Sequence, residues 1–546
     1  MKTRIILITL ISTLILSFAQ KIEGLEWPGH VKVYTDLAEF VLSSSDHQKW
    51  SNNGIEVKFS VSKGLMAVDI SSPAKNIKNI NIKWAMQQSD SSLYLGDHWE
   101  RSYGDLSWQK LNSTRIMPWY FMVFDGNVCK GYGVMTGCHS FASWNITKDS
   151  LSLNLDTRNG TKGVELGTRT LRAAEIVCYT GNNKEDAFTT AVNFCRLMSP
   201  HPRLPKQPVY GINDWYFAYG HNSAALILET VNLMAPLAKD KNNPPFCVID
   251  DGWIKKDTGL AYNWSSNYAE SNASTFGDMA LLAAKIKTAG MRPGIWTRPL
   301  CASTNEKSEN VLSRTRGSKY PILDPTVPSN MEKIISYFKL YQKWGFEMVK
   351  FDYTTFDILG KWGFQMFRDK DITSGDWSFS DKSKTSAEVI IDLYKNIRQA
   401  SGNMYLIGCN TVGHLAAGFF ELQRIGDDTS GKEWARTLNM GVNTLAFRAC
   451  QHNTFFAVDA DCVGLTTDIP WKLNKQWLQL LTESGTTLFI SVQPQALGEE
   501  QRAYIEKCFS IAAKSFNVGQ PLDWMQTKTP SKWLLRDKKV QFDWGK

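Results

Sequence analysis

Several features that define common functional classes are missing from this sequence. The eight histidines form no cluster with metal-ligand spacing, so we expect no metal site. No Gly-rich loop opens any predicted strand–helix unit, which disfavours a nucleotide cofactor, and we expect no cofactor. The net charge of +8 is small for 546 residues and includes no basic block, so nucleic acid is an unfavoured partner.

Membrane-spanning and repetitive architectures are also disfavoured. Beyond the N-terminus no apolar run is long enough to cross a bilayer, and no internal repeat or low-complexity tract is present. The hydrophobic content of 43% and charged content of 21% are typical of a folded globular protein. The 20 tryptophans suit stacking on sugar rings, although the core of a large β-rich protein explains them equally well.

The first 19 residues are predicted to be a signal peptide. Lys2 and Arg4 precede an apolar stretch at 5–16, and small residues then allow a cut before Gln20. We therefore expect a periplasmic or secreted protein, or a lumenal one in a eukaryote. Its oligomeric state cannot be inferred from these features.

Ten cysteines are spread along the chain, and export would permit disulfides. Their spacing matches neither a small disulfide framework nor a zinc site. Cys129 and Cys138 are a candidate bridge. Cysteines inside the predicted strands of the second domain are expected to be buried thiols.

Two larger domains and a small terminal region are predicted. Residues 20–205 contain short alternating strands, such as 54–61 and 151–155, which favour an antiparallel β-sandwich. A Pro-rich linker at 199–208 follows. Residues 206–515 alternate strands with helices, and 516–546 are predicted to be a small C-terminal β-region.

The alternation in 206–515 indicates an α/β fold with parallel strands. Eight strands with intervening helices favour a (β/α)8 TIM barrel, and an open doubly wound sheet is the main alternative. The predicted strands are 209–215, 246–250, 293–297, 348–352, 404–408, 422–426, 455–459 and 487–492.

The fourth of these strands carries a lysine and an aspartate on one face. It follows a predicted helix at 332–344 that ends at Gly345. Because strand side chains alternate, Lys350 and Asp352 point the same way into the protein interior. Two such charges must be paired, either as a structural ion pair or as part of a functional site.

Acidic residues follow several other strands. In a barrel, residues at the C-terminal strand ends meet at one mouth, where active sites lie. A single aspartate there is usually a helix cap, but four acidic strand ends favour a shared function. The acidic residues are Asp250, Asp251, Asp352, Asp427, Asp428, Asp459 and Asp461.

Separated carboxylates suit cleavage of a glycosidic bond, which needs one anionic and one protonated carboxyl group. Asp352 is the better nucleophile because Lys350 favours its anionic form. Asp428 is the better acid because its neighbour Asp427 tends to keep one of the two protonated. Arg424 has the strand parity to reach the same pocket as Asp428.

Three segments resemble the signatures of the α-galactosidases of glycoside hydrolase clan D, with family 36 nearer than family 27. They are Ile-Asp-Asp-Gly-Trp at 249–253, Val-Lys-Phe-Asp at 349–352 and Arg-Ile-Gly-Asp-Asp-Thr at 424–429. Further similarity lies at 293–296, at Trp215–Tyr216 and at Gly408–Cys409, and the whole resemblance covers about 208–513.

The resemblance implies a retaining exo-glycosidase acting on terminal α-galactosides, with Asp352 as nucleophile and Asp428 as acid/base. It also implies a set of substrate-binding residues: Asp250 and Asp251 for the 4- and 6-hydroxyls, Lys350, Cys409 and Arg424 for the 2- and 3-hydroxyls, Trp296 against the ring, and Tyr216 and Asp461 nearby. For Trp296 and Cys409, core packing is the alternative role.

Departures from the family pattern leave other functions open. Residues 410–414 match no known subsite pattern, and Asp427 stands where a non-acidic residue is usual. The sugar can therefore be an N-acetylated or 6-deoxygenated galactose or β-L-arabinopyranose, and the enzyme can be a transglycosylase. A galactoside-binding protein without catalysis, and a lyase with Lys350 as Schiff-base lysine, are the alternatives from other classes.

Overall fold

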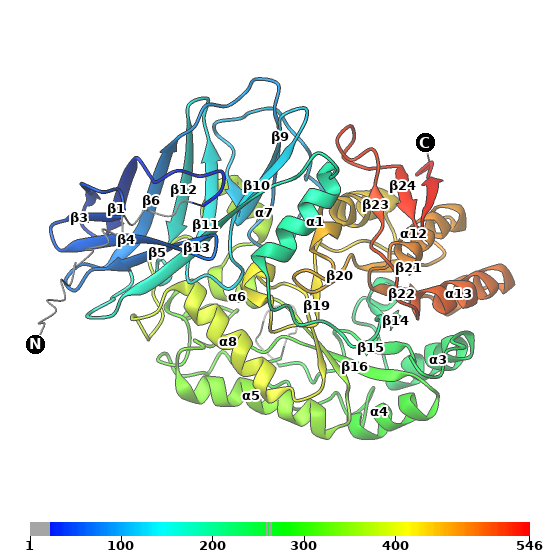
Figure 1. Ribbon diagram of the computed structural model, residues 1–546. Helices are drawn as coiled ribbons and strands as arrows, with labels where there is room; N and C mark the ends of the chain where they lie inside the picture. The colour runs from blue at the N-terminus through cyan, green and yellow to red at the C-terminus, as the bar shows by residue number, and fades with distance from the viewer. Residues whose placement is uncertain (1–21, 258–259, 261–264, 546) are drawn as a thin grey trace, which may run out of the picture.

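The computed structural model describes residues 22–257, 260 and 265–545. The predicted signal peptide and its cut before Gln20 lie outside the described residues. Within the described ranges, no helix is both long and apolar enough to cross a membrane. Figure 1 shows antiparallel sheets in the N-terminal part, in blue and cyan, beside a curled sheet surrounded by helices, in green to red.

The N-terminal part contains a six-stranded sheet of order β2-β1-β6-β12-β11-β8 and a seven-stranded sheet of order β3-β4-β5-β13-β10-β9-β7. Pairing within both sheets is antiparallel, as predicted. In β12 the side chains of Leu151, Leu153 and Leu155 are fully buried, and the alternation forms the core face. The strands are β1 His30–Thr35, β2 Glu39–Val41, β3 Lys49–Asn52, β4 Ile55–Ser62, β5 Leu65–Ser71, β6 Ile77–Ala85, β7 Leu93–Gly96, β8 Met117–Pro118, β9 Tyr120–Phe124, β10 Cys129–Val134, β11 Phe141–Ile146, β12 Ser150–Asp156 and β13 Leu171–Thr180.

The candidate bridge between Cys129 and Cys138 is wrong, because both cysteines are free and buried. Cys129 begins β10, and an extended strand of six residues carries the chain roughly 15–20 Å away before Cys138 is reached. That separation exceeds the Cα distance that a disulfide can span. Cys247, which lies within a predicted strand, is a buried thiol, as expected, and Cys409 and Cys462 are also free and buried.

The second part is built on a curled, parallel nine-stranded sheet of order β20-β19-β18-β17-β16-β15-β14-β22-β21. All eight predicted strands are present, and β21 was not predicted. Only Ala460 and Asp461 separate β20 from β21, and Thr487 N, just before β22, donates to Val458 O of β20 at 3.1 Å. The strands are β14 Tyr210–Asn213, β15 Phe246–Ile249, β16 Arg292–Thr297, β17 Met348–Phe351, β18 Tyr405–Gly408, β19 Leu422–Arg424, β20 Ala457–Asp459, β21 Cys462–Leu465 and β22 Leu488–Val492.

Helices cover the outside of this sheet (Figure 1). Gly345, at φ 88°, stops α5 in the left-handed conformation that the sequence predicted for it. Helix α8 begins with a reciprocal capping box between Thr385 and Glu388. The α-helices are α1 Ala187–Met198, α2 Trp215–Ala218, α3 Ala224–Met234, α4 Met279–Thr288, α5 Pro328–Lys343, α6 Thr354–Leu359, α7 Gly363–Asp369, α8 Ser386–Ala400, α9 Gly413–Ala416, α10 Trp434–Arg436, α11 Thr444–Arg448, α12 Trp471–Glu483 and α13 Glu499–Ala512.

A three-stranded antiparallel sheet ends the chain, with β23 Gln520–Pro521, β24 Lys532–Leu535 and β25 Lys538–Gln541. Arg536 and Asp537 both have positive φ, which is the backbone of a type I′ two-residue hairpin turn. Trp533 is fully buried beneath this hairpin. The predicted small C-terminal β-region is therefore present as a sheet.

A loop from the N-terminal part, residues 97–109, joins the parallel sheet at the end of β19. Ser102 N donates to Ile425 O at 2.9 Å, and Asp427 N donates back to Ser102 O at 3.0 Å. The buried Arg448 donates to Asp97 Oδ1 at 2.7 Å and to the carbonyl of Glu100 at 2.8 Å. These bonds hold the loop in one position over the sheet.

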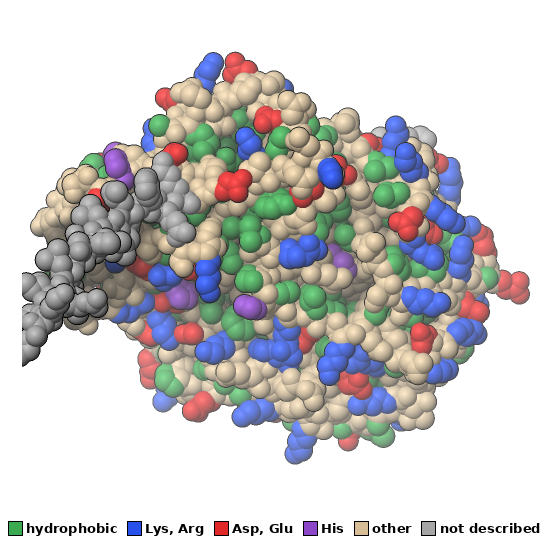
Figure 2. All heavy atoms as spheres, viewed as in Figure 1, with side chains coloured by type: hydrophobic (Ala, Val, Ile, Leu, Met, Phe, Trp, Pro, Cys, Tyr) green, Lys and Arg blue, Asp and Glu red, His purple; other side chains and the backbone are tan. Residues whose placement is uncertain are grey.

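On the face visible in Figure 2, basic and acidic side chains are intermingled over the helices and sheets. Neither sign dominates that face. A cluster of charged side chains lies instead in the interior, at the carboxyl ends of the parallel strands.

Candidate active site

The sequence-predicted site residues gather at the carboxyl ends of the parallel strands. Register pairs Trp296 of β16 with Lys350 of β17, and Arg424 of β19 with Asp459 of β20. The other predicted residues follow directly: Asp250 and Asp251 after β15, Asp352 after β17, Cys409 after β18, Asp428 after β19, Asp461 between β20 and β21, and Tyr216 in α2 after β14. Parallel pairing thus brings residues from seven strands and the segments that follow them to one edge.

Lys350 forms its ion pair with Asp250, and the expected Lys350–Asp352 pair is wrong. Lys350 Nζ lies 2.7 Å from Asp250 Oδ2, which also accepts from Asn213 Nδ2 at 2.7 Å. Asp250 follows β15, which is separated from β17 by β16, so the carboxylate that reaches Lys350 comes from two strands away, whereas Asp352 lies two residues beyond Lys350 in sequence. The pKa of Lys350 is nevertheless raised well above its usual value: burial opposes this, while Asp250, and less strongly Asp352, favour the ammonium.

Asp352 is oriented by two hydrogen bonds. Tyr353 N donates to its Oδ1 at 2.7 Å, and Trp296 Nε1 donates to its Oδ2 at 3.3 Å. Tyr353 has a left-handed backbone at φ 63°, an uncommon conformation for an aromatic residue. This strained turn directs the carboxylate of Asp352 away from the strand and back over Trp296.

Arg424 links three other site residues. Its Nη2 donates to Asp428 Oδ1 at 2.9 Å and to the hydroxyl of Tyr216 at 3.1 Å, and it forms a very close ion pair with Asp461. Asp461 also accepts from the Tyr216 hydroxyl and from Thr429 N. The sequence prediction that Arg424 shares a pocket with Asp428 is confirmed. Asp461, whose motif was weak, is joined to the same network.

Asp428 lies among cations, and the expectation that Asp427 raises its pKa is wrong. Burial raises the pKa of Asp428, but Arg424, Arg101 and Lys350 together hold it below the usual value. Asp427 is itself neutralised by two arginines, Arg101 at 3.2 Å and Arg436 at 2.7 Å. Asp428 is therefore anionic in the unliganded protein, and its side chain is 40% exposed.

The N-terminal loop contributes residues that sequence reasoning missed. Arg101 is almost fully buried and forms ion pairs with Glu100 at 2.7 Å, with Asp427, and with Asp428 at 3.9 Å. Glu100 also accepts from Gly363 N at 2.8 Å. The adjacent Glu-Arg pair within an aromatic segment is the only local signal, because hydrophobic periodicity cannot show that a distant loop reaches this sheet.

Asp214 and Asp251 are carboxyl groups with raised pKa values. Burial, and then the negative charge of Asp250, raise the pKa of Asp214 to about 7 and that of Asp251 to about 6. Asp214 Oδ1 accepts from Asp250 N at 2.7 Å, so it supports the loop that carries Asp250. Burial also raises the pKa of Asp459, the last residue of β20, to about 6.

Trp296 and Cys409 are both buried, and each also contacts charged site residues. Trp296 donates to Asp352, as above, while Cys409 Sγ lies 3.8 Å from Arg424 Nη1. Burial and the nearby Asp352 raise the pKa of Cys409 well above its usual value, so it remains a neutral thiol. Within the described part of the chain, no group of three His, Cys, Asp or Glu side chains could hold a metal ion.

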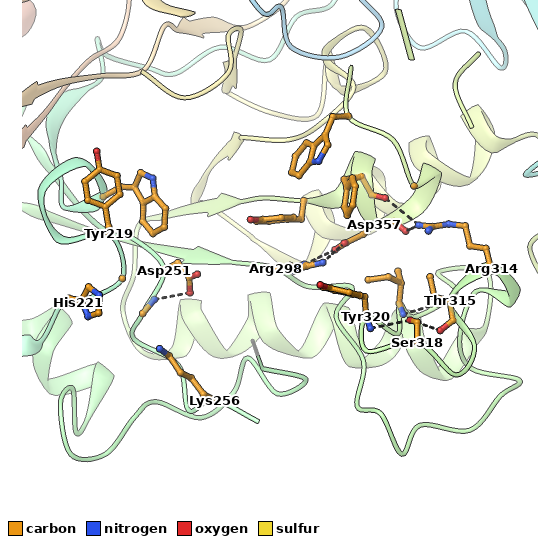
Figure 3. A pocket seen from close by; sticks show the side chains of 18 residues that line it. Tyr219, His221, Asp251, Lys256, Arg298, Arg314, Thr315, Ser318, Tyr320 and Asp357 are labelled. Atoms are coloured by element: carbon orange, nitrogen blue, oxygen red, sulfur yellow. Dashed lines mark hydrogen bonds and ion pairs between the residues drawn. The ribbon is translucent and has the colours of Figure 1, made fainter. Parts of the chain in front are cut away.

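A cavity of about 840 Å³ adjoins these residues. Its wall includes Asp251 and Tyr353, together with the aromatic side chains of Trp215, Tyr219 and Trp362. Figure 3 shows Tyr219 and Asp251 at one end of this cavity and Arg314 at the other, with the Arg298–Asp357 ion pair between them. The volume lies in the range of known small-molecule sites.

No protein-family model and no curated protein matches this chain. Solved structures match over most of its length. TtGalA, an α-galactosidase from Thermus thermophilus in complex with p-nitrophenyl α-D-galactopyranoside, has a TM-score of 0.60 and 15% identity over 94% of this chain and 99% of that one. The glycoside hydrolase family 36 α-galactosidase AgaA from Geobacillus stearothermophilus has a TM-score of 0.59 and 12% identity over 92% of this chain and 76% of that one. At these identities the likeness shows that the chain has the fold of these α-galactosidases.

Proposed function

We propose that this protein is an exported, retaining, exo-acting glycoside hydrolase that removes terminal α-galactosyl groups from oligosaccharides. One observation carries the proposal: Asp352 directly follows β17 and Asp428 follows β19, and parallel pairing of both strands with β18 brings the two carboxylates to the same edge of the sheet. Carboxylates from non-adjacent strands at one such edge can face a common space. Two carboxyl groups across one sugar ring are the requirement for double displacement.

In this mechanism Asp352 attacks the anomeric carbon while the protonated form of Asp428, which low pH favours, gives its proton to the departing glycosidic oxygen. A covalent glycosyl-enzyme forms on Asp352 as the C–O bond to the leaving group breaks. Asp428, now anionic, then removes a proton from water, which attacks the same carbon and releases Asp352. The hydrogen bonds from Trp296 and Tyr353 N hold Asp352 in one orientation for both steps.

The remaining polar residues would hold the sugar. Asp250 and Asp251 would accept hydrogen bonds from the 4- and 6-hydroxyls, and Lys350, Cys409 and Arg424 would contact the 2- and 3-hydroxyl side. Trp296 would lie against the ring. Because Asp250 is paired with Lys350, the two are fixed before substrate arrives, which reduces the entropy lost on binding.

The proposed domain organisation follows the sheets. Residues 20–205 form a β-sandwich, 206–515 a catalytic (β/α)8 barrel and 516–546 a small β-region, after removal of a signal peptide at 1–19. The barrel interpretation treats β20 and β21 as two halves of one strand, supported by the hydrogen bond from Thr487 N to Val458 O.

A Schiff-base lyase is disfavoured by the site itself. Such a lysine must lose its proton to act as a nucleophile, whereas the Asp250 carboxylate at 2.7 Å stabilises the charged form of Lys350. The anionic form of Asp428 gives no reason to prefer a transglycosylase over a hydrolase. Hydrolysis of an α-galactoside is therefore the first activity to test.

The test compares Asp352→Asn with Asp376→Asn, an exposed aspartate of the same part of the chain that is 79% accessible. We expect D352N to lose at least about 10³-fold in kcat while still binding substrate, and D376N to match the unmodified enzyme. Proton NMR of the first product should show the α-anomer. An initial β-anomer, or near-normal turnover by D352N, contradicts the retaining mechanism.

A further inference from the structure

The cavity beside the reaction centre is larger than one sugar ring needs and has a distinctive charge distribution. Two of its wall residues, Asp251 and Tyr353, belong to the proposed sugar site, but Asp428 does not line it. The rest of the wall comes from the segments that follow β14, β15, β16 and β17. The cavity therefore begins beside Asp251 and Tyr353 and extends the proposed sugar site away from Asp428.

Arg314 is the charged group of this wall that no carboxylate neutralises. Its Nε donates to Ile358 O at 3.1 Å and its Nη2 to Phe356 O at 3.2 Å, so the guanidinium is held at the end of α6 by backbone carbonyls. The structure records no ion pair for it among the described residues. Burial consequently lowers the pKa of Arg314 to about 10, with only a partial opposing effect from Asp357.

The other charges of the wall do not cancel Arg314. Arg298 and Asp357 are fully buried and neutralise each other in a bidentate pair, with Nη2 to Oδ1 at 2.6 Å. Lys256 faces Asp251, whose pKa is raised to about 6. The wall thus carries one cation more than it has anions, and that cation is the half-buried Arg314.

We propose that this cavity binds an anionic group of the substrate, a carboxylate or a sulfate ester, through Arg314, so that the natural substrate is an acidic α-galactoside-containing glycan. This inference rests on the proposed function. A planar guanidinium fixed by carbonyls can present its remaining N–H groups to a carboxylate or sulfate without further ordering. The aromatic side chains of Tyr353 and Trp362 supply faces on which the attached sugar can stack.

The acidic group can lie on the leaving sugar or on the galactose itself, and the substrates separate these sources. The first pair is an α-galactosyl-glucuronic acid and the α-galactosyl-glucose of the same linkage. The second pair is a 6-O-sulfated α-galactoside and its unsulfated form. We expect kcat/KM to be about tenfold higher for the acidic member of one pair, and this preference to fall as ionic strength rises because the contact is charge-based.

Substitutions of cavity residues test whether the cavity is responsible for the preference for acidic substrates. Arg314→Gln should reduce the acidic-to-neutral ratio of kcat/KM to about one, and Arg314→Lys should retain part of it. Arg316→Gln is the matched control, since Arg316 lies two residues away, is exposed and donates only to a backbone carbonyl at Ser308. If R314Q does not fold, Arg314→Lys carries the test: its acidic-to-neutral ratio should fall below that of the unmodified enzyme, while Arg316→Lys should leave the ratio unchanged.

The outcomes are distinct from failure of the proposed function. If neither neutral galactoside is cleaved by the unmodified enzyme, the hydrolase assignment itself fails. If neutral galactosides are cleaved and neither acidic substrate is preferred, only the anionic subsite is wrong. A preference that persists undiminished in R314Q, or in R314K where R314Q does not fold, also overturns it, because the charge would then be recognised elsewhere.

Discussion

Replacing Arg101 should change the pH dependence of catalysis, although this residue lies in the N-terminal loop. The alkaline limb of kcat/KM for an acid-assisted reaction reports the pKa of the essential acid in the free enzyme. For Asp428 that pKa is below its usual value, because Arg424, Arg101 and Lys350 outweigh the effect of burial. We therefore expect an acidic optimum, with activity falling as pH rises and Asp428 loses its proton.

The contribution of Arg101 can be estimated from its distance. Arg101 Nη1 lies 3.9 Å from Asp428 Oδ1, and Asp428 is 40% exposed, so an effective dielectric constant of about 40–80 applies. Coulomb attraction is then about 1–2 kcal/mol, equivalent to about one pH unit. In Arg101→Gln the anionic form of Asp428 loses this stabilisation, so the alkaline limb should move upward by about one pH unit.

The assay is a pH profile of kcat/KM on an α-galactosyl disaccharide, whose sugar leaving group needs protonation. An aryl galactoside with a good leaving group is the internal control, because its cleavage depends little on the acid. Arg101→Lys retains the charge and should leave the limb nearly in place. Asp427→Asn releases Arg101 and Arg436 from a shared ion-pair partner, so both can act more strongly on Asp428 and the limb should shift the other way, toward lower pH.

A folded Arg101→Gln protein whose alkaline limb stays fixed, or moves down, refutes the reasoning. Thermal unfolding distinguishes this from collapse of the loop, because Glu100 loses its ion-pair partner in the variant. Glu100 keeps its hydrogen bonds from Gly363 N and from Tyr103, so the loop should remain ordered.

Three further predictions concern stability and binding. The pKa of Asp459 is about 6 in the folded protein, against 3.8 for a free carboxyl group, so the folded state binds more protons than the unfolded state. The free energy of unfolding should therefore fall as pH rises from about 4 to 6. Asp459→Asn should remove up to about 3 kcal/mol of this pH dependence, measured by urea titrations at pH 4 and 7. Gly131→Ala should destabilise by about 1–3 kcal/mol in the same assay, since a Cβ there would overlap the ring of Phe194 in α1; Gly29→Ala is the control, because its Cβ would meet no atom closer than 3.9 Å and its φ is not positive. Trp296→Phe should lower kcat more than it raises KM, because it removes the hydrogen bond to Asp352; an unchanged kcat contradicts the orienting role.

The strand ends were predictable because local rules determine them. Alternation and turn residues located all eight parallel strands, and their parallel arrangement required the following residues to meet at one edge. Partners across strands were not predictable: Lys350 pairs with Asp250, 100 positions away, because register and side-chain height are set by the closed packing of the sheet. The prediction of the surroundings of Asp428 was wrong for the same reason, because no local sequence pattern indicates that Arg101 lies beside it.

The bond between Ser102 and Ile425 spans 323 positions of sequence. During synthesis Ser102 leaves the ribosome long before Ile425 has been added to the chain. The proposed catalytic edge can therefore be completed only after nearly the whole polypeptide has been synthesised. Expressing residues 206–546 alone would leave Asp427 and Asp428 without Arg101 and expose the carbonyl of Ile425 to solvent. Residues 22–205 thus complete the proposed reaction centre, and expressing residues 206–546 without them should abolish the proposed activity.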